Sequence, residues 1–353
     1  MMRPGRREVL GGAVAAASTL MLPGAMARAA APAPDALAVI APELRVAAAK
    51  VRATTSALPP IEQAYRTIRM APVSPPASDI PYVERRIAGS GGNPDVTVYV
   101  INARPGAGRG GILHVHGGGF IVGSAREAIP QCQVLARELD CVVVTVEYRL
   151  APETTYRGSV EDNHSALVWV HAHAAELGID PARIAVMGES AGGGHAALLA
   201  LAARDRRSVP LLFQALIYPM LDDRTGSVRQ PPPSIGRIGW DARANRFGWS
   251  AFLGRPAGGA DVPAAAVPAR VADLSGLPPT FIAVGSVDLF VDEDLAYARR
   301  LIDAGVPTEM LVTPGAFHGF DTVAPETGLA QRFTAAKIAA LRRAFDAPPA
   351  RPR

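Results

Sequence analysis

Short apolar runs alternate along most of the chain with longer segments in which apolar residues recur every three or four positions. The short runs are rich in β-branched residues and predict strands, whereas the longer periodic segments predict helices. Strands are expected at 83–89, 95–102, 111–116, 141–147, 183–187, 211–217, 280–285 and 308–313. Helices are expected at 126–139, 160–176, 191–205, 290–304 and 327–345. This order predicts an α/β protein with an eight-stranded, mostly parallel sheet flanked by helices.

Two stretches depart from this alternation and are expected to be additions to the sheet domain. Residues 37–80 precede the first strand, and residues 220–278 follow the sixth, where prolines and glycines interrupt aromatic-bearing helical pieces. The first two strands are separated by the turn-forming segment 90–94 and are expected to form an antiparallel hairpin. The remaining predicted divisions are the two parts of the sheet domain, 81–219 and 279–346, and a tail, 347–353.

The N-terminus has the pattern of an export signal. An Arg6-Arg7 pair precedes a weakly apolar run and a small-residue segment at 25–29, an arrangement that resembles a twin-arginine signal. Residues 1–29 are therefore predicted to be a signal peptide, followed by a linker at 30–36. The apolar run is too short and too diluted to anchor the chain stably in a membrane. A periplasmic or secreted location is expected, with a frayed cytoplasmic N-terminus as the alternative.

Composition and charge narrow the class of protein further. The chain has 353 residues, of which 49% are hydrophobic, and this excludes disordered and collagen-like proteins. The net charge is +4 and falls to about +1 without residues 1–29, so no nucleic-acid partner is expected. Cys132 and Cys141 are too few for a disulfide framework and are expected to be small buried side chains. The sequence leaves the oligomeric state open, a dimer included.

A nucleophile motif follows the fifth predicted strand. Gly188-Glu-Ser-Ala-Gly192 fits the pattern Gly-x-Ser-x-Gly between a strand and an alanine-rich helix. In so tight a turn, side chains at either glycine position would collide with neighbouring backbone. The turn would expose the Ser190 hydroxyl and place the Ala191 N–H at a positive helix N-terminus, where an oxyanion can form. Ser190 is therefore the predicted nucleophile, and an ordinary glycine-rich helix start is the alternative.

A glycine-rich loop follows the third predicted strand. The segment His116-Gly-Gly-Gly-Phe120 stands where a serine hydrolase brings further backbone donors over its nucleophile, and glycines allow that close approach. In a rival interpretation Gly117, Gly119 and Gly123 bind the phosphates of a dinucleotide in an oxidoreductase, and Glu147 holds the ribose. The apolar residues 120–122 argue against this interpretation, because they stand where the pyrophosphate would bind.

The partners of a serine nucleophile are expected downstream, first an acid and then a histidine. Asp288 follows the seventh predicted strand and His318 the eighth, so both fall at the sheet edge where open α/β sheets place their sites. His318 would take the proton of Ser190, and Asp288 would orient His318. Three rival acids are expected to face solvent or cap the next helix: Asp292, Glu293 and Asp294. His114 is expected in the strand core or at its rim, and no histidine spacing fits a metal site.

Together with Tyr148-Arg-Leu-Ala-Pro-Glu153, these motifs resemble the hormone-sensitive-lipase family of bacterial esterases within the α/β-hydrolase superfamily. The resemblance covers roughly residues 80–345. It implies a helical cap built from the two added stretches, and hydrolysis of small carboxylic esters without a cofactor. It also implies that Gly118, Gly119 and Ala191 donate to the oxyanion, while Gly117 shapes the turn.

Aromatic residues gather in the second added stretch. They are expected chiefly to attach a cap helix to the sheet domain, with direct contact to the acyl group as the alternative. The candidate pocket residues are Phe120, Trp240, Phe247 and Trp249. A closed apolar pocket favours small-molecule esters with short to medium acyl chains. An amidase or carbohydrate deacetylase would use the same catalytic residues, and a binding protein on a hydrolase fold is a further alternative.

Overall fold

The computed structural model describes residues 35–70, 73, 75–77 and 79–347, so the predicted signal peptide lies outside the described residues. One sheet of eight strands carries the fold, in the order β1-β2-β4-β3-β5-β6-β7-β8. Neighbouring strands are parallel except for β1 with β2 and β2 with β4. The strands are β1 (Tyr82–Ile87), β2 (Val96–Ile101), β3 (Arg109–Val115), β4 (Val142–Glu147), β5 (Ile179–Glu189), β6 (Phe213–Ile217), β7 (Thr280–Gly285) and β8 (Thr308–Thr313). The predicted α/β fold is confirmed.

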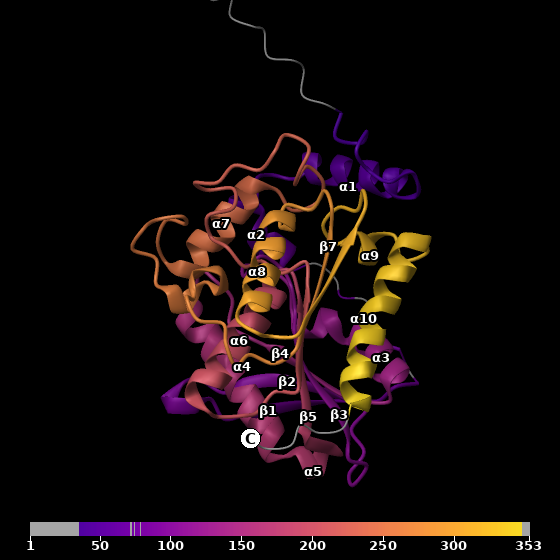
Figure 1. Cartoon of the computed structure of the whole chain (residues 1–353), viewed down its shortest axis with the longest axis vertical. Helices are drawn as coiled ribbons and strands as arrows, with labels where there is room; N and C mark the ends of the chain where they lie inside the picture. Colours follow the sequence, from indigo (N-terminus) through magenta and orange to yellow (C-terminus); the bar gives the residue numbers. More distant parts are fainter. Residues whose placement is uncertain (1–34, 71–72, 74, 78, 348–353) are drawn as a thin grey trace, which may run out of the picture. The chain divides into compact units, whose positions relative to one another are not determined.

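Helices cover both faces of this sheet (Figure 1). One face packs against α3 (Ala125–Leu139) and α10 (Gly328–Asp346). The other face packs against α4 (Tyr156–Ala172), α6 (Ala191–Arg206) and α8 (Val291–Asp303). Two short helices complete the layers, α5 (Ala174–Leu177) and α9 (Phe320–Val323). Because side chains alternate along a strand, Ile112 lies in the core with α3 and α10, whereas Leu113 lies in the core with α4 and α6.

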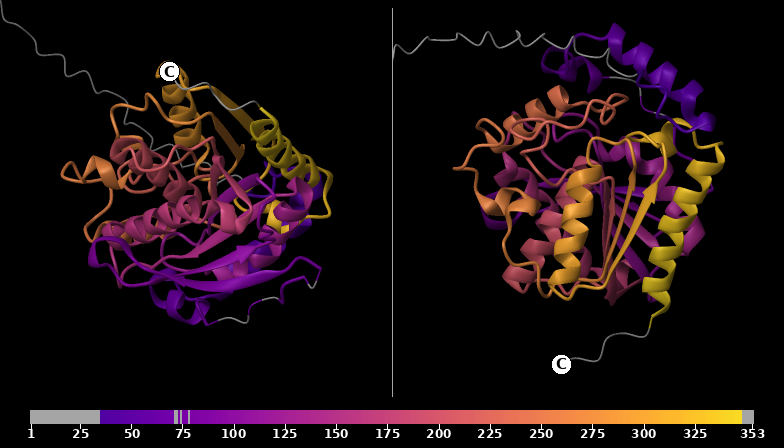
Figure 2. Two further views of the ribbon diagram at one scale, coloured as in Figure 1. Left: turned by 90° about the horizontal axis from the view of Figure 1, so that it is seen from below. Right: turned by 45° about the horizontal axis from the view of Figure 1, so that its top comes forward.

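The two added stretches meet beyond the carboxyl ends of the strands (Figure 2). The first stretch forms α1 (Arg45–Ala57) and α2 (Ile61–Ile68), and the second forms α7 (Ala242–Leu253). Helix α1 packs against α9, and α2 packs against α7. No helix in the described part of the chain is both long enough and apolar enough to span a bilayer. Cys132 and Cys141 are both buried and are not joined in a disulfide.

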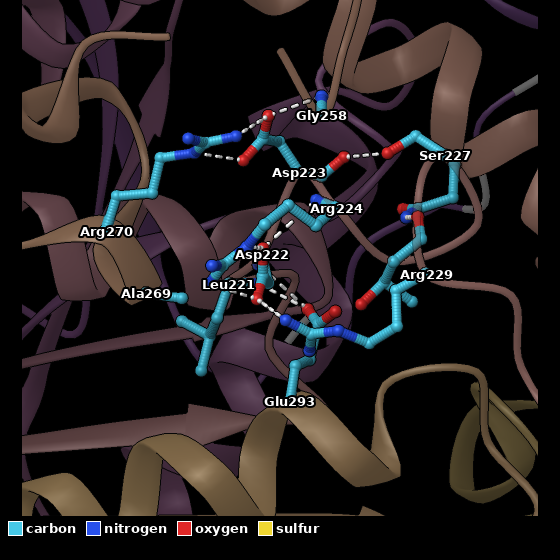
Figure 3. Close-up of polar contacts among 12 residues, drawn as sticks. Leu221, Asp222, Asp223, Arg224, Ser227, Arg229, Gly258, Ala269, Arg270 and Glu293 are labelled. Atoms are coloured by element: carbon cyan, nitrogen blue, oxygen red, sulfur yellow. Dashed lines mark hydrogen bonds and ion pairs between the residues drawn. The ribbon is translucent and has the colours of Figure 1, made fainter. Parts of the chain in front are cut away.

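Buried ion pairs hold the insertion where it leaves β6 (Figure 3). The Asp223 side chain is fully buried, and its carboxylate accepts two hydrogen bonds from the Arg270 guanidinium, at 2.6 and 2.9 Å. It also accepts the N–H of Gly258 at 2.7 Å. The neighbouring Asp222 is paired with Arg224 and Arg229, which lower its pKa although its burial acts in the opposite direction. These contacts fix the first residues of the insertion close to the sheet.

Candidate active site

A tight turn between β5 and α6 presents Ser190. The residue adopts φ 58° and ψ −122°, a left-handed conformation that is strained for a residue with a side chain. A Cβ atom at Gly188 would lie 2.2 Å from the carbonyl oxygen of Gly192, and one at Gly192 would lie 2.0 Å from that of Val115. Glycine is therefore required at both positions, for the steric reason expected from the motif.

Backbone hydrogen bonds to the chain around the end of β6 hold Ser190 in this conformation. Its N–H donates to the carbonyl of Ile217 at 2.9 Å, and its own carbonyl accepts the N–H of Met220 at 2.9 Å. Directly after Met220, the carboxyl group of Glu293 accepts the N–H groups of Leu221 and Asp222 at 2.6 and 3.1 Å. The first residues of the insertion are thus tied to the serine turn on one side and to α8 on the other.

The structure brings the three predicted catalytic side chains together. His318 Nε2 lies 2.9 Å from Ser190 Oγ, and His318 Nδ1 lies 2.8 Å from Asp288 Oδ2. Asp288 is fully buried, whereas the His318 side chain is 12% exposed. This is a continuous hydrogen-bonded chain from a buried carboxylate through an imidazole to a hydroxyl. Such a chain can deprotonate the hydroxyl while keeping the imidazolium paired.

Aromatic rings and backbone fix the orientation of this chain. The rings of Tyr218 and Phe290 meet the His318 imidazole at steep angles, with centroid separations of 4.8 and 5.1 Å. The second oxygen of Asp288 accepts the N–H of Phe290 at 3.0 Å, so both carboxylate oxygens are engaged. With each group held from two sides, the imidazole has little freedom to turn away from Ser190.

The glycine-rich loop after β3 lies against the serine turn. A Cβ atom at Gly117 would lie 3.4 Å from the Cβ of Ser190. The following residues Gly118, Gly119 and Phe120 all have positive φ, at 122°, 58° and 68°. Within the described residues, the N–H groups of Gly118, Gly119 and Ala191 donate to no protein acceptor. Unpaired N–H groups beside a nucleophile are the donors that an oxyanion needs.

The comparisons with known proteins agree with this geometry. Residues 112–322 match the model of a protein family described as alpha/beta hydrolase fold. The chain belongs to this family. The carboxylesterase NlhH of Mycobacterium tuberculosis is 38% identical over 67% of this chain and 74% of the relative. The esterase LipI of the same organism is 34% identical over 80% of this chain and 88% of its own length.

The solved structures give the same result. A bacterial heroin esterase superposes on this hydrolase with a TM-score of 0.75 and 37% sequence identity, covering 88% of this chain and 99% of that chain. These relatives confirm the resemblance to hormone-sensitive-lipase-like bacterial esterases that the motifs indicated. They also confirm the predicted enzyme class, a carboxylesterase-type hydrolase.

Of the four candidate pocket residues in this hydrolase, Trp240 lies against Gly119, one of the predicted oxyanion donors. A Cβ atom at Gly119 would lie only 2.2 Å from the six-membered ring of the indole. The indole N–H donates to the side chain of Asn245 at 3.1 Å, which holds the ring in this orientation. Trp240 therefore borders the space next to the proposed oxyanion donors.

The other three candidate pocket residues attach the insertion to the rest of the protein. Phe120 and Trp249 are fully buried, and both contact the Phe252 ring, at centroid separations of 4.0 and 5.7 Å. Phe247 packs on Tyr65 of α2 at 5.8 Å. Trp249 and Phe120, whose ring centroids are 4.9 Å apart, thus attach the insertion to the sheet domain, whereas Phe247 joins the two added stretches to each other.

For two of the rival acids, the expectation that they face solvent or cap the helix is wrong. Glu293 and Asp294 are buried, at 2% and 0% exposure, and do not face solvent. They lie on the side of α8 that packs inward, and burial raises the pKa of both carboxyl groups well above the ordinary range. Within the described residues, neither forms a hydrogen bond to His318, which is bonded to Asp288.

The dinucleotide alternative also fails on geometry. The Glu147 carboxylate accepts the N–H of Ala125 at 2.9 Å and so supports the start of α3 instead of facing a ribose. Helix α3 begins at Ala125, after Ser124 caps it, so of the three glycines in that alternative Gly117 and Gly119 lie well before the helix start and Gly123 alone is near it. In the described part of the chain, no group of three or more His, Cys, Asp or Glu side chains is placed to hold a metal ion.

A second histidine–carboxylate pair escaped the sequence analysis. His114 Nε2 lies 2.9 Å from Glu189 Oε2, and His114 Nδ1 lies 2.9 Å from Thr145 Oγ1. Burial by itself would lower the pKa of His114, but Cys132 and Glu189 beside it raise this pKa to about 10. His114 is therefore a buried imidazolium paired with the residue directly before the nucleophile. The sequence did show a histidine near the end of a predicted central strand. It could not show that Glu189 is the partner of this histidine, because that depends on which strands are neighbours in the sheet.

Proposed function

We propose that this protein hydrolyses carboxylic esters through an acyl-enzyme intermediate on Ser190. As Oγ attacks the ester carbonyl, its proton passes to His318 Nε2, and Asp288 stabilises the resulting imidazolium. His318 then returns the proton to the departing alcohol oxygen. In the second half of the reaction, His318 takes a proton from water as the water oxygen attacks the acyl carbonyl. The proton then returns from His318 to Ser190 Oγ as the acid leaves. The observation that carries this proposal is the hydrogen-bonded chain of 2.9 and 2.8 Å.

The negative charge that forms on the carbonyl oxygen needs donors that are already in place. The unpaired N–H groups of Gly118, Gly119 and Ala191 fit that role, since all three belong to turns next to Ser190. The N–H of Ala191 has the added field of the α6 N-terminus. We assign these three groups to the oxyanion hole, with Gly117 providing the close approach to the serine turn.

The substrates proposed are small esters with short to medium acyl chains. The cap closes on the loop that holds the oxyanion donors, because the ring of Trp240 lies against Gly119. A Cβ atom at Gly248 of α7 would come within 2.5 Å of the Gly119 carbonyl oxygen. The aromatic side chains beyond this contact, Trp249 and Phe252, are packed in the core, which supports a short acyl site on that side.

The test is hydrolysis of p-nitrophenyl acetate, butyrate, octanoate and palmitate by the full chain and by its Ser190→Ala variant. Turnover is expected to be highest on the short esters and to fall at least about 10³-fold in the variant. Thermal unfolding of both proteins checks that the variant is folded. Undiminished turnover in folded Ser190→Ala would overturn the proposed mechanism, and the highest turnover on palmitate would overturn the proposed substrate class.

We further propose that the protein is exported through its twin-arginine segment and acts in the periplasm or outside the cell. The support is the Arg6-Arg7 pair with the apolar run that follows it. The full chain would be expressed in a bacterium with a twin-arginine pathway, beside a variant with Arg6→Lys and Arg7→Lys. Esterase activity is expected outside the cytoplasm for the unaltered chain and inside it for the variant, and equal distributions would exclude this route.

A further inference from the structure

One side chain of the N-terminal addition reaches the loop that holds the proposed oxyanion donors. Arg69 follows α2 directly, and its guanidinium spans two separate loops. Its Nε donates to the carbonyl of Ile121 at 2.7 Å, and its Nη2 donates to the carbonyl of Ala151 at 2.6 Å. Both terminal nitrogens also lie 3.1 Å from one carboxylate oxygen of Glu153. A planar guanidinium can serve these divergent acceptors at once, whereas a lysine ammonium could not match the fork.

The loop that Arg69 contacts is conformationally demanding. Its residues Gly118, Gly119 and Phe120 have positive φ in succession, and Phe120 carries a large side chain in that strained region. The backbone hydrogen bonds within this loop form a single tight turn. In it, the N–H groups of Ile121 and Val122 both donate to the Gly118 carbonyl, at 3.0 and 2.9 Å. Such a conformation persists only when its surroundings hold it.

Arg69 reinforces a backbone hydrogen bond that links this loop to the neighbouring one. The N–H of Ala151 donates to the Phe120 carbonyl at 2.9 Å. The guanidinium then binds the carbonyl of Ile121, the residue after Phe120, and the carbonyl of Ala151 itself. It therefore closes a second bridge across the same two loops.

The guanidinium itself is held in place. It stacks on the ring of Tyr65, 5.1 Å from the ring centroid, and Tyr65 is 4% exposed. Tyr65 in turn packs on Phe247 of α7. The Arg69 side chain is 21% exposed, whereas that of Glu153 is 54% exposed. The two hydrogen bonds to backbone carbonyls are therefore shielded from solvent, whereas solvent weakens the ion pair with Glu153.

We propose that Arg69 is a positioning residue for ester hydrolysis, which holds the oxyanion loop in its donating conformation through the carbonyls of Ile121 and Ala151. This inference rests on the proposed function. The N-terminal addition then does more than cover the site, because its last helical turn fixes the geometry in which the N–H groups of Gly118 and Gly119 meet the developing charge.

The experiment compares Arg69→Met with a matched control, Arg66→Met, in the full chain. Arg66 lies in the last turn of α2, just before Arg69, carries the same charge and stacks on the same Tyr65 ring at 4.7 Å. It is exposed and makes no hydrogen bond in the described part of the chain. Two further variants separate the contacts: Arg69→Lys keeps the charge without the fork, and Glu153→Gln removes the carboxylate but keeps both carbonyl bonds.

In Arg69→Met, kcat on p-nitrophenyl butyrate is expected to fall about 10- to 100-fold while KM changes less than about threefold, since the loop acts on the transition state. The affinity for a trifluoromethyl ketone, which forms an oxyanion adduct with the serine, should fall in parallel. Arg69→Lys should recover only part of kcat. Arg66→Met and Glu153→Gln should stay within about threefold of the unaltered protein.

Thermal unfolding of each variant distinguishes a misplaced loop from a lost fold. The inference is overturned if folded Arg69→Met keeps its kcat, or if Arg66→Met loses as much as Arg69→Met does. It is also overturned if Arg69→Met raises KM alone, because the residue would then contribute to substrate binding. Failure of the proposed function would look different, since Ser190→Ala would then remain active.

Discussion

Two histidine–carboxylate pairs lie next to the nucleophile, and their surroundings differ more than their chemistry does. His318 and Asp288 are on the loops that follow β8 and β7, 2.8 Å apart, and the imidazole is 12% exposed. His114 and Glu189 are on the neighbouring central strands β3 and β5, 2.9 Å apart, and the imidazole is fully buried. Both carboxylates orient an imidazole, so the presence of such a pair does not by itself mark a catalytic site.

The second ring nitrogen decides between the two roles. In His318, Nε2 faces the hydroxyl of Ser190 and can exchange a proton with it. In His114, Nδ1 is bonded to Thr145 Oγ1 inside the sheet, and no substrate can reach it. The first pair is therefore placed to move a proton, whereas the second lies at the end of β5, from which the serine turn projects.

The largest expected effect comes from His318→Gln. This variant removes the base but keeps a polar side chain of similar size, so turnover of p-nitrophenyl butyrate should fall at least about 10³-fold. Its unfolding temperature should stay close to that of the unaltered protein, because the histidine is partly exposed. Steady-state kinetics and thermal unfolding measure the two effects. Retained turnover would show that His318 is not the base.

Breaking the second pair should act on stability and not on chemistry. Glu189→Gln leaves the His114 imidazolium buried without its counter-charge, and the free energy of unfolding should fall by about 3–5 kcal/mol. KM should change little in the protein that remains folded. Chemical denaturation measures the loss, and the matched variant is His114→Leu with Glu189→Leu, which removes both charges and should be more stable than Glu189→Gln. A double variant less stable than the single one would contradict this account.

The pH dependence of stability should report on the same pair. Burial lowers the pKa of His114, but Cys132 and Glu189 outweigh it and raise this pKa to about 10, above the value of about 6.5 in an unfolded chain. Between these values the folded state binds more protons than the unfolded state. The stabilisation is therefore complete below about pH 6.5 and is lost as the pH rises towards 10. Denaturant unfolding at several pH values measures this loss, with the unaltered protein as the control. Between pH 7 and 9.5 the free energy of unfolding should decline less steeply in Glu189→Gln than in the unaltered protein.

The smallest expected effect concerns the outer hydrogen bond of the buried pair. Thr145→Val keeps the shape of the side chain but removes the acceptor of His114 Nδ1, so the free energy of unfolding should fall by about 1–3 kcal/mol. Turnover per folded molecule should be unchanged, as measured by kinetics beside denaturant unfolding. A loss of kcat in this variant would mean that the buried pair influences the reaction directly.

Much of the fold could be predicted, because strand and helix periodicities are local properties of the chain. The boundaries of β7 and β8 agree with the predicted strands, and the serine turn needs glycine at 188 and 192 for the steric reason given by the motif. The sequence-based expectation for Glu293 and Asp294 was wrong. Helical spacing places them on a face of α8, but which face packs inward depends on the insertion and the neighbouring strands.

The sequence by itself determined the hydrolase class and the catalytic candidates, since these depend on residue types at short spacings and on strand ends that share one edge of a parallel sheet. Tertiary structure alone decided that the predicted partners meet, because Ser190 and His318 are brought to 2.9 Å by strands far apart in the chain. It also decided that Glu189 pairs with His114 and that Arg69 reaches Ile121. These contacts depend on strand order and on helix docking, which no local pattern of residues encodes.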